Sequence, residues 1–211
     1  MAIIYAFGDS ITYGAWDIRL SGWASRLRLF LDEKLAKDSD LYYLLYNLGI
    51  PGENTQGLIK RFSAETTARV RKDEEAVFIF AYGANDLVFL KNENRFRVPK
   101  DEFVSNLDGV IREALTLSSK VILINIVPVL EDVFAAHTHN KNKSRSNKDI
   151  REYNEALADL AKKHSLPLVD AHSVFMDAGH EKLFAEDGLH PNEDGHRLLF
   201  EAVKDTVGGM L

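Results

Sequence analysis

The chain of 211 residues contains 45% hydrophobic and 27% charged residues, which is typical of one ordinary globular domain. The formal net charge of −6 argues against a nucleic-acid-binding protein, because such proteins usually present a basic face. No cysteine occurs, and this absence excludes a catalytic thiol, a disulfide framework and a thiolate metal site.

The opening residues predict a strand. Residues 1–7 are apolar but short, and they lack the basic residues that begin a secretory leader. No apolar run along the chain approaches the roughly 20 residues that a membrane-spanning helix needs. We therefore expect a cytoplasmic protein with no membrane span, although removal of a leader before this point would leave the same sequence.

Strand-like and helix-like segments alternate from here onwards. Five short apolar runs predict buried strands, at residues 3–7, 42–48, 76–82, 121–127 and 166–169. Apolar residues recur at helical intervals in the segments between and after them, over residues 23–35, 58–70, 103–114, 150–161 and 198–203. Continuous apolar strands alternating with amphipathic helices indicate an α/β fold, with a parallel sheet covered by helices on both faces. With no internal repeat and no clear boundary, residues 1–211 are expected to form a single domain.

Three polar segments that contain glycine follow predicted strands, at residues 8–10, 49–54 and 83–86. In sheets of this kind, ligands bind at the carboxyl ends of the strands, so these segments are candidates for a site. Two longer irregular stretches, residues 128–148 and 177–192, are candidates for functional loops.

Ser10 is the first candidate for chemistry, because it follows the first strand directly. A serine hydroxyl is a weak nucleophile and needs a base, and the best base in the chain is His190. Asp187 lies three residues before His190, where a carboxylate can orient the imidazole and stabilise its charged form. Each residue taken alone also suits a turn or a helix cap.

Acyl transfer also requires hydrogen-bond donors for the developing oxyanion. Gly52 and Asn85 follow the second and third predicted strands, and they offer a backbone N–H and a side-chain amide. Either residue alone is explained as well by turn chemistry. Their joint occurrence with Ser10, Asp187 and His190 at one predicted sheet edge favours a serine hydrolase.

These residues belong to four short sequence blocks. The blocks are residues 8–12 (GDSIT), 47–55 (NLGIPGENT), 83–86 (GAND) and 187–191 (DGLHP). Together, and in this order, they resemble the SGNH hydrolase superfamily, also called the GDSL esterases and lipases. The resemblance extends over nearly the whole chain, and the ordered set is far more specific than any single block.

The resemblance implies a role for each matching residue. Ser10 would be the nucleophile and would give one oxyanion donor through its backbone N–H. Gly52 and Asn85 would complete the oxyanion hole, His190 would be the base, and Asp187 would be its partner. The fold implied is a three-layer α/β/α sandwich of the flavodoxin-like kind with five parallel strands.

Three details qualify the resemblance. Gly49 is the less favoured alternative to Gly52, because the family glycine usually precedes an acid or amide and a threonine, as Gly52 does. Ile11 stands where the family name has leucine after the serine. The G-x-S-x-G elbow of the other large class of α/β serine hydrolases is absent around Ser10, so that class is not supported.

We therefore expect a serine esterase or acylhydrolase that forms an acyl-enzyme on small ester or O-acetylated substrates. No metal ion, organic cofactor or nucleic acid is expected to take part. Thioester hydrolysis and acyl transfer to another alcohol stay open, as do the acyl and alcohol groups and the oligomeric state.

Two other classes of function compete with this interpretation. A metal-dependent phosphoesterase could use His137 and His139 together with the acids near His190. A non-catalytic ligand-binding module on the same fold would be expected to have lost part of the catalytic set, which is complete here.

Two groups of residues beside the blocks, one basic and one aromatic, each have more than one interpretation. The basic residues Lys141, Lys143, Arg145 and Lys148 predict a solvated, mobile loop, with attraction of an anionic substrate or a lid as alternatives. The aromatic residues near strand ends fit either an acyl pocket or ordinary packing, and they are Tyr13, Trp16, Phe89 and Phe134.

Overall fold

The computed structural model describes residues 2–38, 42–71, 73–118 and 120–211, and its centre is a five-stranded parallel sheet. The strands in spatial order are β2 (Tyr43–Gly49), β1 (Ala2–Gly8), β3 (Glu75–Ala81), β6 (Lys120–Ile124) and β8 (Leu168–Val169). This order is the flavodoxin-like one, in which the connections reverse direction beside the first strand. The expected sheet is therefore confirmed.

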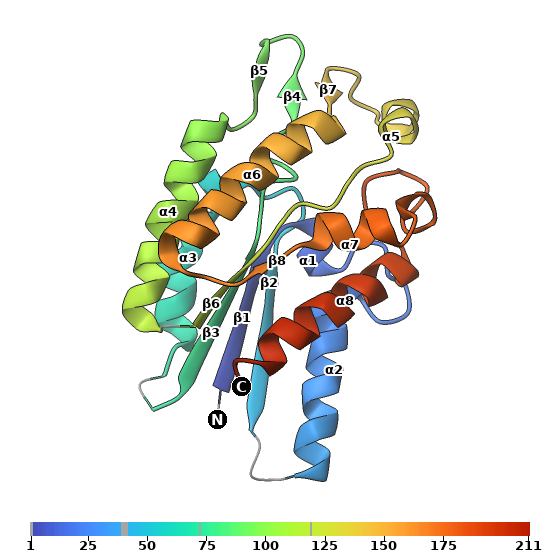
Figure 1. Ribbon diagram of the computed structural model, residues 1–211. Helices are drawn as coiled ribbons and strands as arrows, with labels where there is room; N and C mark the ends of the chain where they lie inside the picture. Colours follow the sequence, from blue (N-terminus) through green and yellow to red (C-terminus); the bar gives the residue numbers. More distant parts are fainter. Residues whose placement is uncertain (1, 39–41, 72, 119) are drawn as a thin grey trace.

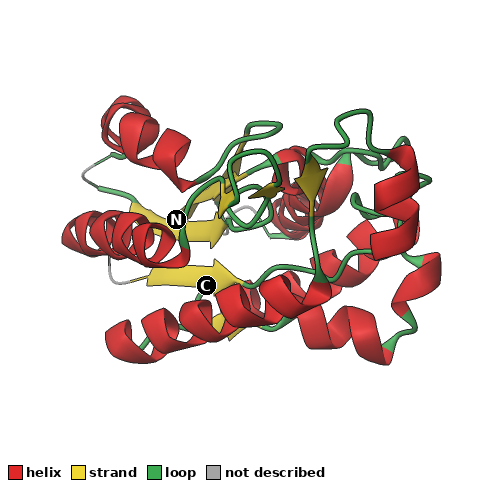
Figure 2. Cartoon of the chain, turned by 90° about the horizontal axis from the view of Figure 1, so that it is seen from above, coloured by secondary structure: helices red, strands yellow, loops and turns green. Residues whose placement is uncertain are grey.

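Helices cover both faces of the sheet, as Figures 1 and 2 show. One face carries α3 (Thr55–Arg69), α4 (Lys100–Leu117) and α6 (Asn147–His164). The other face carries α2 (Gly22–Lys37), α7 (Ala171–Asp177) and α8 (Glu193–Gly208). The expected three-layer α/β/α sandwich is thus confirmed.

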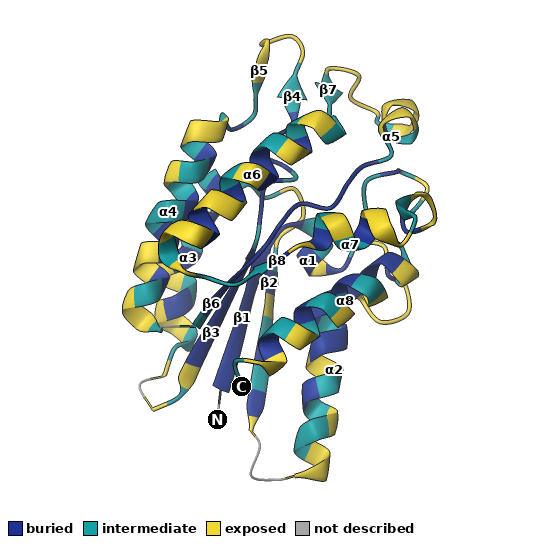
Figure 3. Ribbon diagram, in the orientation of Figure 1, coloured by how far each residue is buried: buried dark blue, intermediate teal, exposed yellow. Residues whose placement is uncertain are grey.

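Strand β1 explains why the strands are apolar without interruption. Ile3, Tyr5 and Phe7 belong to the core under α3, α4 and α6, while Ile4 and Ala6 belong to the core under α2 and α8. Alternate side chains of a strand point to opposite faces, so a sheet covered on both sides needs apolar residues at every position. Figure 3 accordingly shows β1 as buried along its length.

The fourth strand ends earlier than the apolar run predicts. Strand β6 stops at Ile124, and the run continues to Val127 outside the sheet. The side-chain amide of Asn154 accepts from the backbone N–H of Ile126 at 2.8 Å and donates to its carbonyl at 2.9 Å. These two bonds take the place of a strand partner, and they turn the chain away from β3.

The long stretch 128–148 contains short elements that the sequence does not predict. Helix α5 (Glu131–His137) is followed by β7 (Lys143–Ser144), which joins β4 (Phe89–Leu90) and β5 (Arg95–Phe96) in a small antiparallel sheet. This sheet lies beyond the carboxyl edge of the main sheet (Figure 1). Two further short helices, α1 (Ser10–Tyr13) and a 3-10 turn at His180–Lys182, lie in other connections at this edge.

Candidate active site

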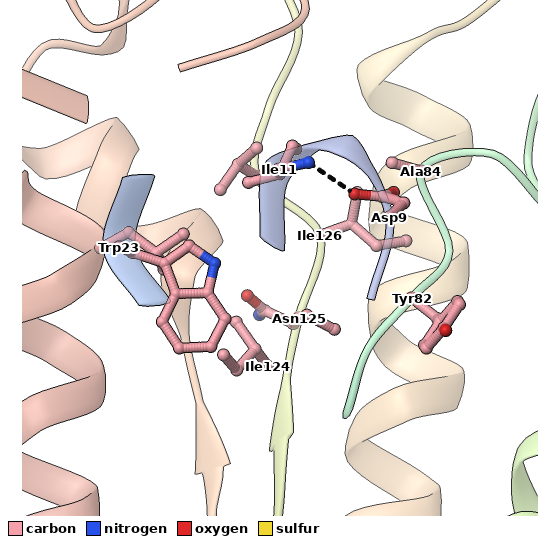
Figure 4. A pocket seen from close by; sticks show the side chains of 11 residues that line it. Asp9, Ile11, Trp23, Tyr82, Ala84, Ile124, Asn125 and Ile126 are labelled. Atoms are coloured by element: carbon pink, nitrogen blue, oxygen red, sulfur yellow. Dashed lines mark hydrogen bonds between the residues drawn. The ribbon is translucent and has the colours of Figure 1, made fainter. Parts of the chain in front are cut away.

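Ser10 stands at the first position of helix α1, immediately beyond the end of β1. Asp9 caps this helix, because its Oδ1 accepts from the backbone N–H of Ile11 at 2.9 Å (Figure 4). The turn also requires Gly8, since a Cβ there would lie 2.1 Å from Thr12 Oγ1 and 2.9 Å from the carbonyl oxygen of Ala81. Local sequence thus fixes the serine at the sheet edge.

Ser10, His190 and Asp187 are brought together as a chain of hydrogen bonds. Ser10 Oγ lies 2.8 Å from His190 Nε2, and His190 Nδ1 lies 2.5 Å from Asp187 Oδ2. The other oxygen of Asp187 accepts from the backbone N–H groups of Leu189 at 2.9 Å and His190 at 3.0 Å. The loop before α8 therefore orients its own carboxylate toward the imidazole.

The charge of Asp187 is strongly favoured by this arrangement. Burial alone would raise the pKa of the carboxyl group. The hydrogen bonds from the His190 ring and from the backbone of His190 and Leu189 outweigh burial, and they hold the pKa of Asp187 well below its usual value. An ionised Asp187 accepts the Nδ1 hydrogen of His190, which leaves Nε2 free to take a proton from Ser10.

Trp16 is a partner of this chain that the sequence does not reveal. Its indole Nε1 lies 3.0 Å from Asp187 Oδ2 and 3.1 Å from His190 Nδ1, and the two rings meet edge to face at 82°. Because Nδ1 itself donates to Asp187, the indole N–H donates to the carboxylate. Trp16 thereby adds a second donor to Asp187 Oδ2.

The loop that carries Trp16 is held in place by hydrogen bonds and an ion pair with buried residues. Buried Asp17 accepts from the backbone N–H groups of Leu20 at 3.0 Å and Gly22 at 3.1 Å, and it forms an ion pair with Arg26 at 2.9 Å. His196 of α8 is 2.9 Å from the carbonyl oxygen of Ala15 through Nε2. This contact of His196 helps to position the loop.

Gly52 and Asn85 lie beside Ser10 on one pocket wall. Gly52 has a φ of 80°, and a Cβ there would meet no atom within 4 Å, so its backbone faces open space. The N–H of Gly49 donates to Asn47 Oδ1 at 3.0 Å, and a Cβ at Gly49 would lie 2.3 Å from the backbone nitrogen of Tyr13. The geometry therefore favours Gly52 over Gly49 as a donor to a bound ligand.

The side chain of Asn85 is held on three sides. Its Nδ2 lies 3.0 Å from the carbonyl oxygen of Glu53 and 3.2 Å from Asp9 Oδ2, while its Oδ1 accepts from Arg145 at 3.3 Å. Glu53 in turn accepts from Arg61, at 2.6 Å to Oε2, and this ion pair fixes the loop that contains Gly52. The amide of Asn85 is thus oriented before any substrate arrives.

Two buried carboxyl groups lie under the site. Burial raises the pKa of Asp9 to about 6, although the hydrogen bond from Ile11 and the positive charge of Arg145 oppose the shift. Burial also raises the pKa of Asp86 to about 6, against the two hydrogen bonds that Thr55 donates to it. Asp9 also borders a small cavity of about 30 Å³ together with Trp23, Tyr82 and Asn125 (Figure 4).

Two larger pockets open on either side of Gly52, Asn85 and Leu189, which line both. The first pocket has a volume of about 620 Å³ and contains the reacting side chains. Its other lining residues are mostly apolar, and they include Tyr13, Trp16, Ile18 and Pro51. The second pocket has a volume of about 570 Å³, and its lining includes Arg97, Phe134, His137, His139, Lys143 and Arg145.

The aromatic residues singled out from sequence divide between different places. Tyr13 and Trp16 line the first pocket, and Phe134 lines the second. Phe89 instead packs edge-on against Phe96 in the small antiparallel sheet, with ring centres 5.4 Å apart. His137 and His139 both line the second pocket, beside basic side chains.

No group of three or more His, Asp or Glu side chains that could hold a metal ion occurs in the part of the chain that the structure describes. Among the same residues, no helix combines the length and the apolar character needed to cross a bilayer.

The chain is similar to known proteins over almost its whole length. The pattern of the GDSL-like lipase/acylhydrolase family matches residues 6–198. The uncharacterized lipoprotein YqeF of Bacillus subtilis (strain 168) is 28% identical, over 96% of this chain and 88% of that protein. The human isoamyl acetate-hydrolyzing esterase 1 homolog is also 28% identical, over 92% of this chain and 76% of that one.

Solved structures show the same fold. The lipase/acylhydrolase from Enterococcus faecalis superposes with a TM-score of 0.78 at 25% identity, covering 100% of this chain and 97% of that one. The acetylxylan esterase Axe2 from Geobacillus stearothermophilus has a TM-score of 0.75 at 19% identity, covering 98% of this chain and 94% of that one.

Proposed function

Since the chain belongs to the GDSL-like lipase/acylhydrolase family, whose members hydrolyse ester bonds, we propose that it is a serine esterase with Ser10 as its nucleophile. The observation that carries this proposal is the contact of 2.8 Å between Ser10 Oγ and His190 Nε2, backed by Asp187 at 2.5 Å from Nδ1. A nucleophile, a base and an orienting acid in hydrogen-bond sequence form the arrangement that activates a serine hydroxyl.

In the acylation step, His190 Nε2 takes the hydroxyl proton while Ser10 Oγ attacks the carbonyl carbon of the ester. The carbonyl oxygen becomes an oxyanion, which accepts from the backbone N–H groups of Ser10 and Gly52 and from one Asn85 N–H, which exchanges its longer contact with Asp9 for the oxyanion. Collapse of this intermediate breaks the bond to the alcohol, and His190 returns its proton to the departing oxygen. The acyl group is then esterified to Ser10.

In the deacylation step, His190 takes a proton from water, and the resulting hydroxide attacks the acyl carbon in the same oxyanion hole. Collapse breaks the bond to Ser10 Oγ, which recovers the proton from His190 and releases the carboxylic acid. Asp187 stays ionised in both steps and stabilises the imidazolium that forms in each, as its lowered pKa permits.

Small esters, including O-acetylated compounds, are the proposed substrates. The first pocket is lined by Tyr13, Trp16, Ile18 and Pro51, which suit a short apolar acyl or alkyl group next to Ser10. The human relative is named for hydrolysis of isoamyl acetate, an ester that joins a short acid to a small apolar alcohol. Residues 1–211 act as one domain in this proposal, and the cytoplasmic location stays a prediction.

A fluorophosphonate label tests the proposal directly. The Ser10 oxygen displaces fluoride from phosphorus, so mass spectrometry is expected to find the label on the peptide that contains Ser10. The variant Ser10→Ala should lose both the label and the hydrolysis of p-nitrophenyl acetate, while EDTA should leave the wild-type rate unchanged. The control variant Ser21→Ala removes another serine of the same pocket and should keep the label. Full hydrolysis by Ser10→Ala would overturn the proposal.

A further inference from the structure

The second pocket differs from the first in its charge. Arg97, Lys143 and Arg145 line it together with His137 and His139, and the single acidic residue in its lining is Asp187. The carboxylate of Asp187 is already engaged by His190, by Trp16 and by two backbone N–H groups. The pocket therefore holds an excess of positive charge next to the reacting groups.

Arg145 is built into the wall of this pocket. Its Nε donates to the carbonyl oxygen of Ala84 at 3.1 Å, and its Nη2 donates to Asn85 Oδ1 at 3.3 Å. The guanidinium also lies 4.7 Å from the centre of the Phe134 ring, which holds it from the other side. Burial lowers the pKa of Arg145 to about 10, and repulsion by Arg97 adds to that shift against the attraction of Asp9 and Asp187.

Arg97 brings a second guanidinium to the pocket, and this one has no bonded partner. Among the hydrogen bonds and ion pairs of the described residues, none uses the side chain of Arg97; only its backbone is bonded, through an N–H to the carbonyl oxygen of Val88 at 2.8 Å and a carbonyl oxygen that accepts from Arg95 at 3.3 Å. Burial lowers the pKa of Arg97, while Asp86 is the acid that attracts it. Asp86 is itself buried and its Oδ1 accepts twice from Thr55, and none of the ion pairs among the described residues joins it to Arg97.

Two partly buried guanidinium groups that repel each other are costly unless an anion lies between them. Arginine forks bind carboxylate and phosphate oxygens in pairs, which makes these two anions the best complement to the pocket. Of the four basic residues in the segment 141–148, only Lys143 and Arg145 line the pocket, and Lys141 donates instead to carbonyl groups at the end of α5.

We propose that the second pocket binds an anionic group, a carboxylate or a phosphate, carried by the ester substrate itself. This inference rests on the proposed esterase function, because it places the ester carbonyl at Gly52 and Asn85, which line both pockets. The neutral part of the substrate then lies in the first pocket and the charged part beside Arg97 and Arg145. The enzyme would accordingly select esters that carry negative charge a few bonds from the carbonyl group.

Two matched pairs of esters test the inference and locate the charge. Monoethyl succinate against ethyl pentanoate places the anion on the acyl side, and 2-acetoxyethyl phosphate against 2-methoxyethyl acetate places it on the alcohol side. The released acid is titrated at constant pH. In at least one pair, kcat/KM of the anionic ester should exceed that of its neutral partner by roughly 10-fold or more, as expected for charge-assisted hydrogen bonds.

The variant Arg97→Gln should reduce this preference by roughly 10-fold to 100-fold. Arg95→Gln is the matched control, since it removes the same charge two residues before Arg97, in β5 and outside the pocket lining. This variant should retain the preference. Lys143→Gln removes a second pocket charge and should reduce the preference a few-fold, which keeps the test valid if Arg97→Gln fails to fold. Raising the salt concentration from about 20 mM to about 500 mM should also reduce the preference, because salt screens partly exposed charges.

The outcomes separate the two proposals. Equal or better turnover of the neutral ester in both pairs would overturn the inference, and so would loss of both members of a pair to the same degree in Arg97→Gln. In either case, hydrolysis of the neutral esters that still depends on Ser10 would leave the esterase proposal standing. Hydrolysis of any of the four esters by Ser10→Ala would instead overturn the esterase proposal.

Discussion

The two pockets beside Asn85 have walls of different construction. The wall of the first pocket is the loop around Trp16, which is anchored to the protein interior by the buried pair of Asp17 and Arg26 and by His196. The wall of the second pocket is built from α5 and the small antiparallel sheet, where β7 is joined to β4 by two residue pairs. The first wall is thus held by contacts with buried residues, whereas the second wall is formed by short elements near the surface.

This difference corresponds to what each wall touches. The first wall donates a hydrogen bond to Asp187, so a shift of the loop would disturb the reacting groups themselves. The second wall reaches the centre through the contact of Arg145 with Asn85, and the N–H of Leu130, just before α5, donates to the carbonyl oxygen of Gly188 in the loop of Asp187 and His190 at 2.8 Å. Side chains bonded to the triad are therefore expected to affect the rate for every substrate, whereas side chains that only line the second pocket are expected to affect selectivity.

The largest effect is expected when His190 is removed, because it is the proposed base for substrates in either pocket. His190→Ala should lower kcat by roughly 10³-fold or more for neutral and anionic esters alike, because His190 is the only base that the described residues place in hydrogen-bond contact with the Ser10 hydroxyl. His164→Ala is the matched control, since His164 is bonded to Asp108 on a distant helix pair. Turnover of either ester class by His190→Ala at more than a tenth of the wild-type rate would contradict this prediction, because that class would then not depend on His190 as its base.

Asn85→Ala should have the next largest effect. Loss of one oxyanion donor is expected to lower kcat on the order of 10²-fold. Because Asn85 lines both pockets, the loss should be the same for substrates that occupy either one. A loss smaller than a few-fold in steady-state kinetics would contradict the oxyanion role. A loss confined to anionic esters would show that Asn85 acts through Arg145 instead.

Asp9 lies beneath both walls, and its effect should appear in stability. Its folded pKa of about 6 lies above that of an unfolded aspartate, so between pH 4 and pH 6 the folded state holds a proton that the unfolded state has lost. The free energy of unfolding therefore falls as pH rises through this window. Asp9→Asn removes that fall, so its stability relative to the wild type should increase on the order of 2 kcal/mol from pH 4 to pH 7.

Urea denaturation at several pH values measures this difference. Asp86, whose pKa is also raised to about 6, titrates in the same window, and because the charge of Asp9 is one cause of that shift, the comparison between variant and wild type cancels its contribution only in part. A stability difference that does not change with pH would mean that Asp9 is ionised throughout the range.

Trp16→Phe tests the link between the first wall and the catalytic residues. An aromatic ring is kept, but it is smaller than the indole and lacks the N–H to Asp187, so kcat should fall by roughly 10-fold, the value of one hydrogen bond to a charged group. KM should change less than kcat, because an aromatic ring still lines the pocket. Tyr13→Phe, in the same pocket, is the control. It removes a hydroxyl group that makes no bond to the triad, so kcat should change by less than about two-fold. An unchanged kcat in Trp16→Phe would reduce Trp16 to a packing residue.

The smallest expected effect concerns Ile18, whose side chain lines the first pocket but is 90% exposed. Ile18→Ser should lower kcat/KM for pentanoate esters by roughly three-fold, because only part of an apolar contact is lost. Acetate esters, which are too short to reach it, should be unaffected. An equal change for both chain lengths would show that Ile18 does not contact the substrate.

The sequence predicted the frame of the molecule better than its detail. The five strands follow from uninterrupted apolar runs, which a sheet covered on both faces requires, and their topology brings Ser10 to His190 across 180 positions. The end of β6 could not be predicted, because it depends on the side chain of Asn154 from a distant helix. Short elements such as α5 and β7 have too few residues to show a period.

The same limit applies to the site. Ser10 was a candidate because a serine directly follows a strand end, and Asp187 and His190 were candidates because an acid and a base stand three residues apart in one loop. Trp16 gave no such signal beyond being aromatic, since its contact with Asp187 depends on how Asp17 folds the loop. Arg97 gave none, because its place in the second pocket depends on a small sheet formed by residues far apart in the chain.

The long separation between Ser10 and His190 has a consequence for the timing of activity during synthesis. The ribosome makes Ser10, the proposed nucleophile, 180 residues before His190, the proposed base. Helix α8, which follows the base, supplies the His196 contact that holds the Trp16 loop. In the proposed mechanism, a nascent chain therefore carries Ser10 without its base until the segment before α8 has been made. The Trp16 loop and the loop of His190 become complete at the same stage, so the proposed hydrolysis of esters begins only then.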